Sequence, residues 1–322
     1  MHHIDRRRFM KTALAVPALS AITVHGGYAS DEGAPPVSET SALPRGTIGD
    51  LEISRLLLGG NLLTHYTHSR DLDYVYTLAE HYNTREKILE TLALAEEHGV
   101  NTLVIHTVDS ALEILHEHRR NGGKMKWIIC PTTPIEPGLA QYEDHVKRMV
   151  DDGVDALYIW GVHADPMARD GQIALLGQAV DMVKAQGVPC GVGGHTLQVL
   201  HECEWSQVRT DFYVKTLHHL DYPTAPAPEE TGDDIAEIPG YWCGKPEDTI
   251  EFMETIEKPV IAFKVMAAGA IRPENAFRYA FINGADFVLA GMFDFEIAED
   301  VNIARSVLAE PEVKNRDRPW RA

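Results

Sequence analysis

The apolar runs of this chain end in histidine or lysine with unusual regularity, and this feature limits the fold more than any other. Six of the eight short runs that we predict as strands end in this way. The residues concerned are His65 and His68, His106, His163, His195, Lys215 with His218 and His219, and Lys264. Polar residues at the carboxyl ends of successive buried strands are typical of the catalytic face of a (β/α)8 barrel.

Short apolar runs alternate with longer amphipathic segments from Gly46 onward, and this alternation predicts the fold class. We expect strands over residues 53–59, 102–106, 126–130, 156–162, 190–193, 212–216, 260–264 and 287–291. Helical spacing of apolar residues predicts helices over 84–98, 111–121, 142–152, 173–186 and 197–203. Eight strands that alternate with helices favour a closed parallel α/β barrel, a TIM barrel, over an open doubly wound sheet.

Two connections are longer than the rest, and both follow strands at the predicted catalytic face. They cover residues 61–83 after the first strand and 218–245 after the sixth. Loops beyond ~15 residues inside a compact domain are usually functional lids or disordered segments. We therefore expect a lid over the site, formed above all by the proline-rich loop 218–245.

The N-terminal segment has the pattern of an export signal. Residues 5–11 (DRRRFMK) resemble the twin-arginine motif, the apolar stretch 12–24 follows, and residues 27–29 offer a small-residue cleavage site. Thirteen apolar residues are too few to span a bilayer core of ~30 Å. We predict a signal peptide over 1–29, a flexible linker over 30–45, the barrel over 46–310 and a C-terminal tail over 311–322. The protein is thus expected to be periplasmic, or otherwise exported, through the twin-arginine route.

Charge and cysteine content narrow the partners further. The chain has 29 Lys and Arg against 48 Asp and Glu, a net charge of -19, which argues against nucleic acid or an anionic membrane as partner of the mature protein. A small molecule is the expected partner.

Export would let the four cysteines form disulfides in three alternative pairings, but a chain of 322 residues does not need such links, so free thiols are expected.

Part of the barrel resembles the aldo-keto reductases. Residues 51–60 (LEISRLLLGG) are similar to the first strand of that family, and 99–101 (GVN) to the segment before its second strand. The resemblance continues weakly through 157–165, 191–200 and 290–304. It implies a reductase-like barrel framework.

The reductase resemblance also implies a catalytic tetrad, which this sequence matches at one position. The family has Asp and Tyr after the second strand, Lys at the end of the third and His at the end of the fourth; only His163 falls in place. The second strand ends at His106 with no tyrosine nearby, and the third at Cys130. Asp294 and Glu296 in the last strand-to-helix turn would repel the 2′-phosphate of NADP. Binding of NAD(P) is therefore not expected.

A second resemblance covers two neighbouring strands. Residues 211–216 (DFYVKT) and 263–272 (FKVMAAGAIR) are similar to strands six and seven of deoxyribose-phosphate aldolase, which implies a Schiff base on Lys215 with Lys264 beside it. Adjacent strands lie ~4.8 Å apart, so two inward ammonium groups would repel and lower the pKa of one. The alternative is a structural ion pair with Asp211 or Asp294.

The histidines allow a metal site as well. His163, His195 and His219 follow different strands, and imidazoles that converge there with a carboxylate can bind zinc or manganese. Acid–base catalysis or hydrogen bonding to substrate is the alternative. If the sixth strand continues past Lys215, His219 shares its inward face and His218 points away.

These patterns together predict an exported TIM-barrel enzyme that acts on a small sugar-like carbonyl or hydroxyl compound by lyase, aldolase-type or isomerase chemistry. The predicted catalytic residues are Lys215, Lys264, His219, His195 and His163. The predicted substrate-binding residues are Asn61, His106, His218, Trp242 and Asp294. The alternatives are a divergent NAD(P)-dependent aldo-keto reductase and a non-catalytic sugar-binding barrel. The cofactor is open, and a divalent metal is one possibility.

Overall fold

The computed structural model describes residues 42–69, 72–227 and 243–322. The predicted signal peptide and most of the predicted linker lie outside these ranges, as do Trp242 and most of the proline-rich loop. Export, the lid and the role of Trp242 therefore stay predictions.

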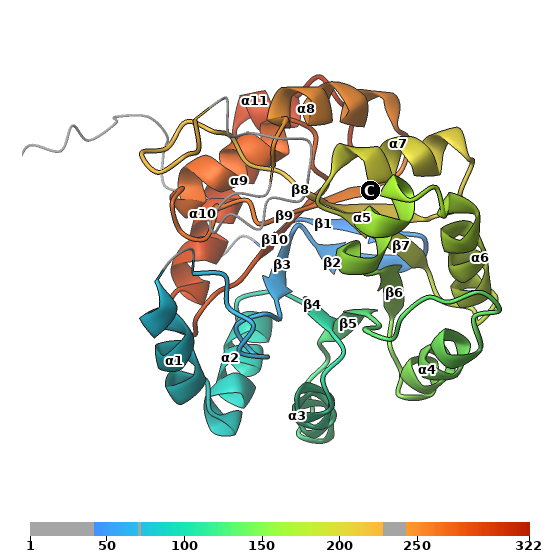
Figure 1. The fold of residues 1–322 in the computed structure, drawn as a ribbon. Helices are drawn as coiled ribbons and strands as arrows, with labels where there is room; N and C mark the ends of the chain where they lie inside the picture. The colour runs from blue at the N-terminus through green and yellow to red at the C-terminus, as the bar shows by residue number, and fades with distance from the viewer. Residues whose placement is uncertain (1–41, 70–71, 228–242) are drawn as a thin grey trace, which may run out of the picture. The chain divides into compact units, whose positions relative to one another are not determined.

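Eight parallel strands close into a barrel that is surrounded by helices (Figure 1). The barrel strands are β3 (Leu56–Gly59), β4 (Thr102–His106), β5 (Lys126–Cys130), β6 (Ala156–Ile159), β7 (Cys190–Gly194), β8 (Phe212–Thr216), β9 (Val260–Phe263) and β10 (Phe287–Ala290). Each strand pairs with the next in the chain, and β10 pairs with β3 to close the ring. The prediction of a TIM barrel is confirmed.

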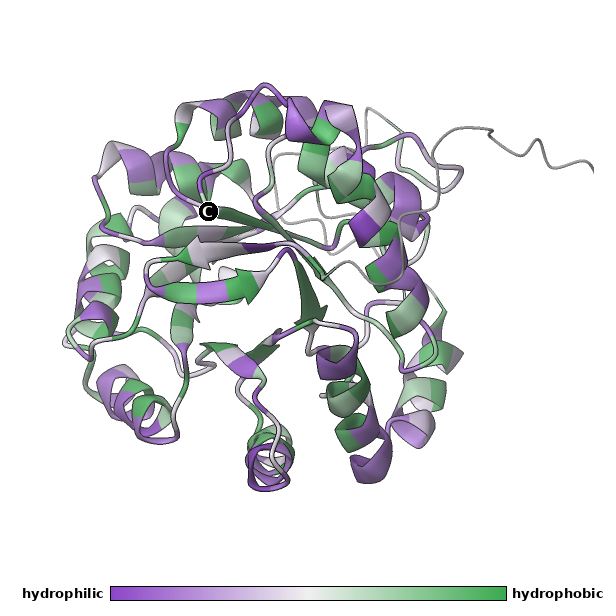
Figure 2. Cartoon of the chain, turned by 180° about the vertical axis from the view of Figure 1, so that it is seen from behind, coloured by the Kyte–Doolittle hydropathy of each residue, from purple (hydrophilic) through white to green (hydrophobic). Residues whose placement is uncertain are grey.

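Helices follow the strands and cover the outside of the barrel. They are α1 (Asp73–Tyr82), α2 (Arg85–Glu97), α3 (Asp109–Arg120), α4 (Ala140–Asp151), α5 (Gly161–Arg169), α6 (Ile173–Lys184), α7 (Leu197–Trp205), α8 (Pro246–Thr255), α9 (Pro273–Ile282), α10 (Ile297–Ala309) and α11 (Pro311–Lys314). Hydrophobic and hydrophilic residues alternate along them, as Figure 2 shows, so each helix can bury one face. None of the helices in the described ranges combines the length and apolar composition that crossing a bilayer requires.

The strands bury side chains on both faces, which produces two cores. On β8, Phe212 and Val214 belong to the cluster inside the barrel, whereas Tyr213 belongs to the cluster between strands and helices. An antiparallel hairpin, β1 (Arg45–Ile48) and β2 (Leu51–Ser54), adds two buried isoleucines to the inner cluster. The expected strand over 53–59 is thus two strands, which separate at Arg55.

Two further predictions about local structure are wrong. The strand expected over 156–162 ends at Ile159, and α5 begins two residues later, so His163 lies on a helix instead of a strand end. Periodicity alone cannot separate a short apolar helix turn from a strand. The connection 61–83 contains α1, where Tyr74, Leu78 and Tyr82 recur at helical spacing although they are exposed, so a signal for this helix was present and was missed.

The C-terminal residues pack against the barrel below β10 and form the cluster that we call the charged floor: Arg55, Asp286, Arg316 and Arg318. Asp286 is fully buried and accepts hydrogen bonds from Arg316 at 3.1 Å and Arg318 at 2.8 Å. Arg55 donates to the backbone oxygen of Asp286 at 2.9 Å. The segment 311–322, expected as a tail, therefore contributes buried side chains to the domain.

Candidate active site

A hydrogen-bonded chain of three side chains lies beyond the carboxyl ends of the barrel strands. Asp165 comes from α5, His195 follows β7 and Lys264 follows β9. His195 Nδ1 lies 2.8 Å from Asp165 Oδ2, and His195 Nε2 lies 3.2 Å from Lys264 Nζ. We call this group the Asp165–His195–Lys264 triad. Two of its members were predicted, and Asp165 was not.

The Asp165 side chain stabilises the turn between β7 and α7 by accepting hydrogen bonds from it. Its side chain is fully buried and accepts from the backbone N–H of His195 and from both the N–H and the hydroxyl of Thr196. Burial alone would raise the pKa of Asp165, but the hydrogen bonds from His195 and Thr196 outweigh it and the pKa is lowered. Gly161 leaves room for the His195 ring, because a Cβ at residue 161 would lie 3.1 Å from that ring, which is a tight contact. A carboxylate therefore persists beneath the imidazole.

The bond to Asp165 fixes the tautomer of His195. A carboxylate only accepts, so Nδ1 of His195 carries the proton and donates it. Burial, the largest cause, lowers the pKa of His195, which keeps the ring neutral at pH 7. Nε2 is then an acceptor, and Lys264 Nζ donates to it. The imidazole is thus oriented to take a proton from whatever occupies the position of the Lys264 amine.

Lys264 lies in a strained segment of backbone. It follows the last residue of β9 and has φ 57°, and Ala267 and Ala268 also have positive φ, at 45° and 53°. Residues other than glycine rarely adopt this conformation, and such strain concentrates at functional sites. Burial lowers the pKa of Lys264 to about 7. A substantial fraction of the amine is therefore neutral, and nucleophilic, near neutral pH.

Lys215 was expected on the inward face of β8 beside Lys264, and this is wrong. It alternates with Phe212 and Val214, which face the barrel interior, and so belongs to the same face as Tyr213. Its ammonium donates to the His195 carbonyl oxygen at 2.6 Å, and to the Thr216 carbonyl and hydroxyl oxygens at 2.9 and 2.8 Å. Burial, and not repulsion by Lys264, is the main cause that lowers the pKa of Lys215.

These contacts engage every polar atom of His195. Asp165 binds its backbone N–H and Nδ1, Lys215 and Thr216 bind its carbonyl oxygen, and Lys264 binds Nε2. The two lysines that we expected side by side thus have different surroundings. Lys215 donates mainly to backbone carbonyl oxygens, and Lys264 donates to a ring nitrogen of His195. Of the two, Lys264 is the candidate for chemistry.

Two more histidines lie within electrostatic reach of Lys264. Burial first, and then the charge of Lys264, lower the pKa of His68 to about 3; burial chiefly lowers that of His218 to about 4, with contributions from Lys215 and Lys264. His68 belongs to the loop after β3 and was not predicted as a site residue. His218, expected to point away, is the buried one of its pair, since β8 ends at Thr216 and the pleat does not continue.

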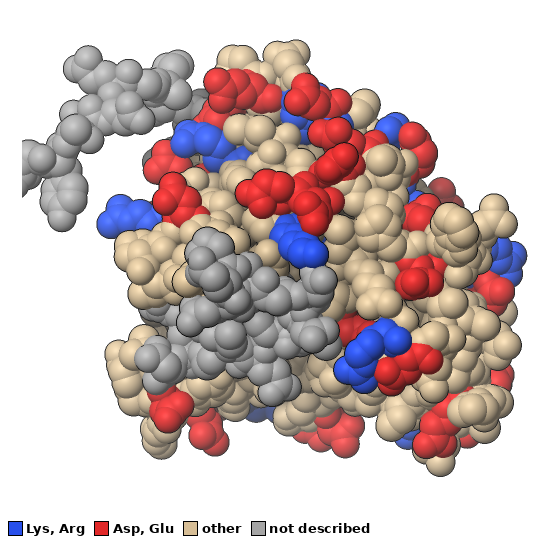
Figure 3. Space-filling view, turned by 45° about the horizontal axis from the view of Figure 1, so that its top comes forward, with Lys and Arg blue, Asp and Glu red and all other residues tan. Residues whose placement is uncertain are grey.

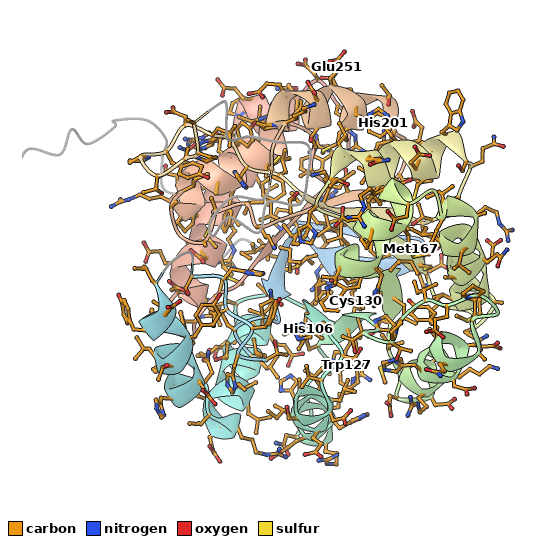
Figure 4. The ribbon with its side chains drawn as sticks, in the orientation of Figure 1. His106, Trp127, Cys130, Met167, His201 and Glu251 are labelled. Atoms are coloured by element: carbon orange, nitrogen blue, oxygen red, sulfur yellow. The ribbon has the colours of Figure 1, made fainter. Side chains whose placement is uncertain are left out.

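Aromatic rings form one side of the site, and we call them the aromatic wall: Tyr66, His106 and Trp160. His106 stacks on Trp160 at 6.0 Å with 9° between the rings, and Tyr66 meets His106 edge-on at 5.7 Å. His68 contacts Tyr66 at 5.5 Å, and the charges of Lys264 and His195 contribute to lowering its pKa. Figure 4 labels His106 and Cys130, which are register partners at the ends of β4 and β5. His106 thus ends β4 beside Trp160, and its predicted role in substrate binding stays a prediction.

Of the remaining predicted residues, His163 contacts the aromatic wall: its ring meets Trp160 edge-on at 5.5 Å, and its Nε2 lies 3.2 Å from the Thr132 carbonyl oxygen. The His219 ring packs against Tyr279 of α9 at 5.1 Å. Asp294 accepts from Tyr82 at 2.7 Å and Lys87 at 3.1 Å, so it ties α1 and α2 to the loop after β10. Asn61 lies near the start of the loop after β3, and its backbone carbonyl oxygen accepts a hydrogen bond from the Tyr66 N–H.

The metal site expected from His163, His195 and His219 is not supported. These histidines have separate surroundings, as described above, and both ring nitrogens of His195 already have protein partners. Within the described ranges, no three His, Cys, Asp or Glu residues gather in an arrangement that could hold a metal ion. All four cysteines are buried free thiols.

No protein-family model and no curated protein matches this chain. Its structure is similar to that of a Pseudomonas aeruginosa protein proposed to be an aldo-keto reductase, with TM-score 0.54 and 17% identity over 84% of this chain and 98% of the other. It is also similar to Gox0644, with TM-score 0.52 and 12% identity over 84% and 96% of the two chains. A variant of Gox0644 solved with NADPH gives TM-score 0.51. At these identities the likeness establishes the barrel fold alone.

Proposed function

We propose that this protein is a lyase of the aldolase type, in which Lys264 forms a covalent imine with a small carbonyl compound. The observation that carries the proposal is the 3.2 Å contact between Lys264 Nζ and His195 Nε2, within a triad whose third member is a buried carboxylate. Strained backbone at Lys264 and the lowered pKa of its amine support it. The proposal moves the nucleophile from Lys215, which the sequence favoured, to its neighbour.

The reaction begins when the neutral Lys264 amine attacks the carbonyl carbon. The resulting carbinolamine loses water to give an iminium ion. His195 Nε2, which accepts from Nζ in the free protein, takes the proton of the substrate's β-hydroxyl group. The bond between the α- and β-carbons then breaks, and its electron pair neutralises the iminium as an enamine. Protonation of the enamine by His195 and hydrolysis by water release the second product and restore the amine.

Asp165 and Lys215 act through His195 in this scheme. Asp165 keeps the proton on Nδ1 and stabilises the imidazolium that forms when Nε2 takes a proton. Lys215 fixes the His195 carbonyl oxygen, and with it the backbone from which the ring projects. Both are positioning residues, since neither is placed against Lys264 Nζ by the contacts described.

Reductive trapping tests the proposal. The protein is incubated with D-glyceraldehyde or pyruvate and sodium cyanoborohydride, and the modified lysine is identified by peptide mass spectrometry. We expect the adduct on Lys264, and its loss in Lys264→Met. The control is Lys314→Met, which removes an exposed lysine of α11. Labelling spread over surface lysines, with no preference for Lys264, would overturn the imine.

A divergent NAD(P)-dependent aldo-keto reductase is the second candidate, because a barrel of the same fold was solved with NADPH bound. Against it stand the mismatches with the family tetrad: β4 ends at His106, β5 ends at Cys130, and His163 bonds a backbone oxygen. Titration calorimetry with NADPH separates the two candidates. Micromolar affinity together with hydride transfer to an aldehyde would favour the reductase.

A further inference from the structure

The helix α1 carries an apolar stripe on its solvent side. Tyr74 is 68% exposed, Leu78 60% and Tyr82 36%, and a spacing of four residues places them along one side of the helix. The structure describes all ten residues of α1, and among these Ala79 alone is buried. A helix this short is marginal in water and usually depends on burial of its apolar side chains. In α1 the side chains that would supply this stability face solvent instead.

Two phenylalanines of the loop after β10 extend the stripe. Phe295 is 66% exposed and stacks on Phe293 at 5.3 Å, with 7° between the rings. Tyr82 meets both rings edge-on, at 5.7 and 6.1 Å, and its hydroxyl donates to Asp294 at 2.7 Å, which fixes the tyrosine in this position. We call the apolar surface formed by Tyr74, Leu78, Tyr82, Phe293 and Phe295 the α1 patch. It lies on the outside of the barrel, where Figure 1 shows α1, and exposed apolar patches of this kind mark interaction surfaces.

The charge of the chain limits what can cover this patch. The net charge is -19, and acidic side chains are conspicuous on the surface in Figure 3. The ten described residues of α1 include neither lysine nor arginine, which helices that bind anionic membranes carry on their polar side. Two copies of an acidic chain repel each other wherever carboxylates meet, so an uncharged surface is where they approach most easily.

The stripe is also complementary to itself. If two α1 helices pack antiparallel about a two-fold axis at Leu78, Tyr74 of one copy meets Tyr82 of the other, because both lie four residues, ~6 Å, from the axis. This arrangement brings Asp73, in the first turn of α1, toward His81 in the last turn of the other copy. The partial charges of the helix ends that meet are also opposite in sign.

The area of the patch suits a weak dimer. At ~200 Å² for each fully exposed side chain of this size, the four exposed members present about 450 Å² per copy. Pairing therefore buries about 900 Å² in total, close to the ~1,000 Å² at which specific interfaces begin, and neighbouring polar residues add to this area.

We propose that the α1 patch is a dimerisation surface, which packs against the α1 patch of a second copy of this chain with the two helices antiparallel about Leu78. The modest area predicts a dissociation constant in the micromolar range. None of the triad residues belongs to the patch, so the dimer and the proposed chemistry can be tested separately.

Sedimentation velocity from about 1 to 200 μM protein tests the dimer. The native protein should pass from monomer to dimer across this range. Leu78→Glu places two carboxylates together at the axis and should weaken the dimer at least tenfold. The control Trp205→Glu changes an 88% exposed tryptophan of α7 and should leave the dimer unchanged. A native protein that stays monomeric throughout, or a dimer that Leu78→Glu leaves intact, would overturn the proposal.

Cross-linking of introduced thiols tests the arrangement and does not depend on the glutamate variant. The four native cysteines are buried, so an introduced surface thiol is the accessible one. On mild oxidation Leu78→Cys should form a covalent dimer, whereas Trp205→Cys, the control for random collision, should not. Tyr74→Cys and Tyr82→Cys should join when mixed but not when each is oxidised alone. Failure of Leu78→Cys to join would contradict the dimer, and self-joining of Tyr74→Cys would contradict the antiparallel order.

A lipid surface is the other occupant to exclude. Vesicles of phosphatidylcholine carry no net charge and therefore do not repel an acidic protein. We expect no co-sedimentation of the native protein with them. A monomer that binds these vesicles, and loses this binding in Leu78→Glu, would assign the α1 patch to a membrane and overturn the dimer.

Discussion

The two ends of the barrel both bury charged side chains, yet they treat them in opposite ways. At the charged floor, Asp286 lies between Arg316 and Arg318, and backbone oxygens take the remaining guanidinium N–H groups. At the mouth, the described contact of the buried Lys264 amine is with a neutral imidazole. The floor thus places a carboxylate and backbone oxygens against its arginines, whereas the described contact of the amine is a ring nitrogen.

The consequence appears in the protonation of each end. Burial lowers the pKa of Arg316 only to about 10, so the floor stays charged at neutral pH. Burial lowers that of Lys264 to about 7, so the charge of the mouth changes with small changes of pH. A paired buried charge contributes to one rigid structure, whereas an amine that gains and loses its proton near pH 7 is suited to covalent catalysis. The same fold thus carries a structural ionic site at one end of its strands and, at the other, the site that we propose to be reactive.

The largest effect should follow from Lys264→Met. Trapping of glyceraldehyde should fall by at least about 1,000-fold, because the nucleophile is gone. The variant should nevertheless unfold at no lower urea concentration than the native protein at pH 7. The folded-state pKa lies below the unfolded one, so Lys264 costs stability that is regained only as pH rises from about 7 toward its ordinary value, at about 1.4 kcal/mol per pKa unit. If the variant failed to fold, Lys264 would be a residue that stabilises the structure, contrary to this prediction.

A substitution in the charged floor should have the opposite effect, lowering stability without changing the trapping rate. Asp286→Ala leaves two arginines buried without their carboxylate and removes the acceptor of the Val260 N–H, which should cost about 3–5 kcal/mol in urea unfolding. The trapping rate of the molecules that remain folded should not change. Asp170→Ala is the control, because its pair with Arg169 is exposed and should contribute less than about 1 kcal/mol. A loss of trapping in folded Asp286→Ala protein would break the separation of the two ends.

The sequence predicted the barrel well because strand and helix periods are local. The limits of β4, β5 and β8 agree with the expected strands residue for residue. The side of the sheet to which Lys215 belongs could not be predicted. A parallel strand that is buried on both sides is apolar throughout, so its sequence does not show which side chains point into the barrel and which point toward the helices. Asp165 was missed for a different reason. Its partner His195 lies 30 residues away, and only the position of α5 brings the two together.

Lys215→Met should sharpen the distinction between the two lysines. Loss of three hydrogen bonds to the His195 and Thr216 oxygens should loosen the imidazole and slow trapping roughly 10- to 100-fold. The adduct should still form on Lys264, and the pH midpoint of its labelling should stay near that of the native protein. An adduct found on Lys215 in the native protein would instead assign the chemistry to the position that the aldolase resemblance implies.

The smallest effect concerns the pH response of Lys264 itself. Labelling by acetic anhydride follows the neutral amine, so its rate at Lys264, relative to exposed Lys314, should drop about tenfold per unit below pH 7 and level off above it. Among the described residues, the titratable groups that interact electrostatically with Lys264 include His68, His195, His218 and Asp165.

Asp165 alone among those groups raises the pKa of Lys264, because its negative charge stabilises the ammonium form. Asp165→Asn removes that charge and retains an oxygen that can accept from His195. The labelling midpoint should therefore move to lower pH, by on the order of one unit or less. The histidines change little in this range, since burial keeps their pKa values below 6.5. A midpoint that moves upward in Asp165→Asn would mean that another carboxylate controls the amine, and the contrast with the charged floor would no longer hold.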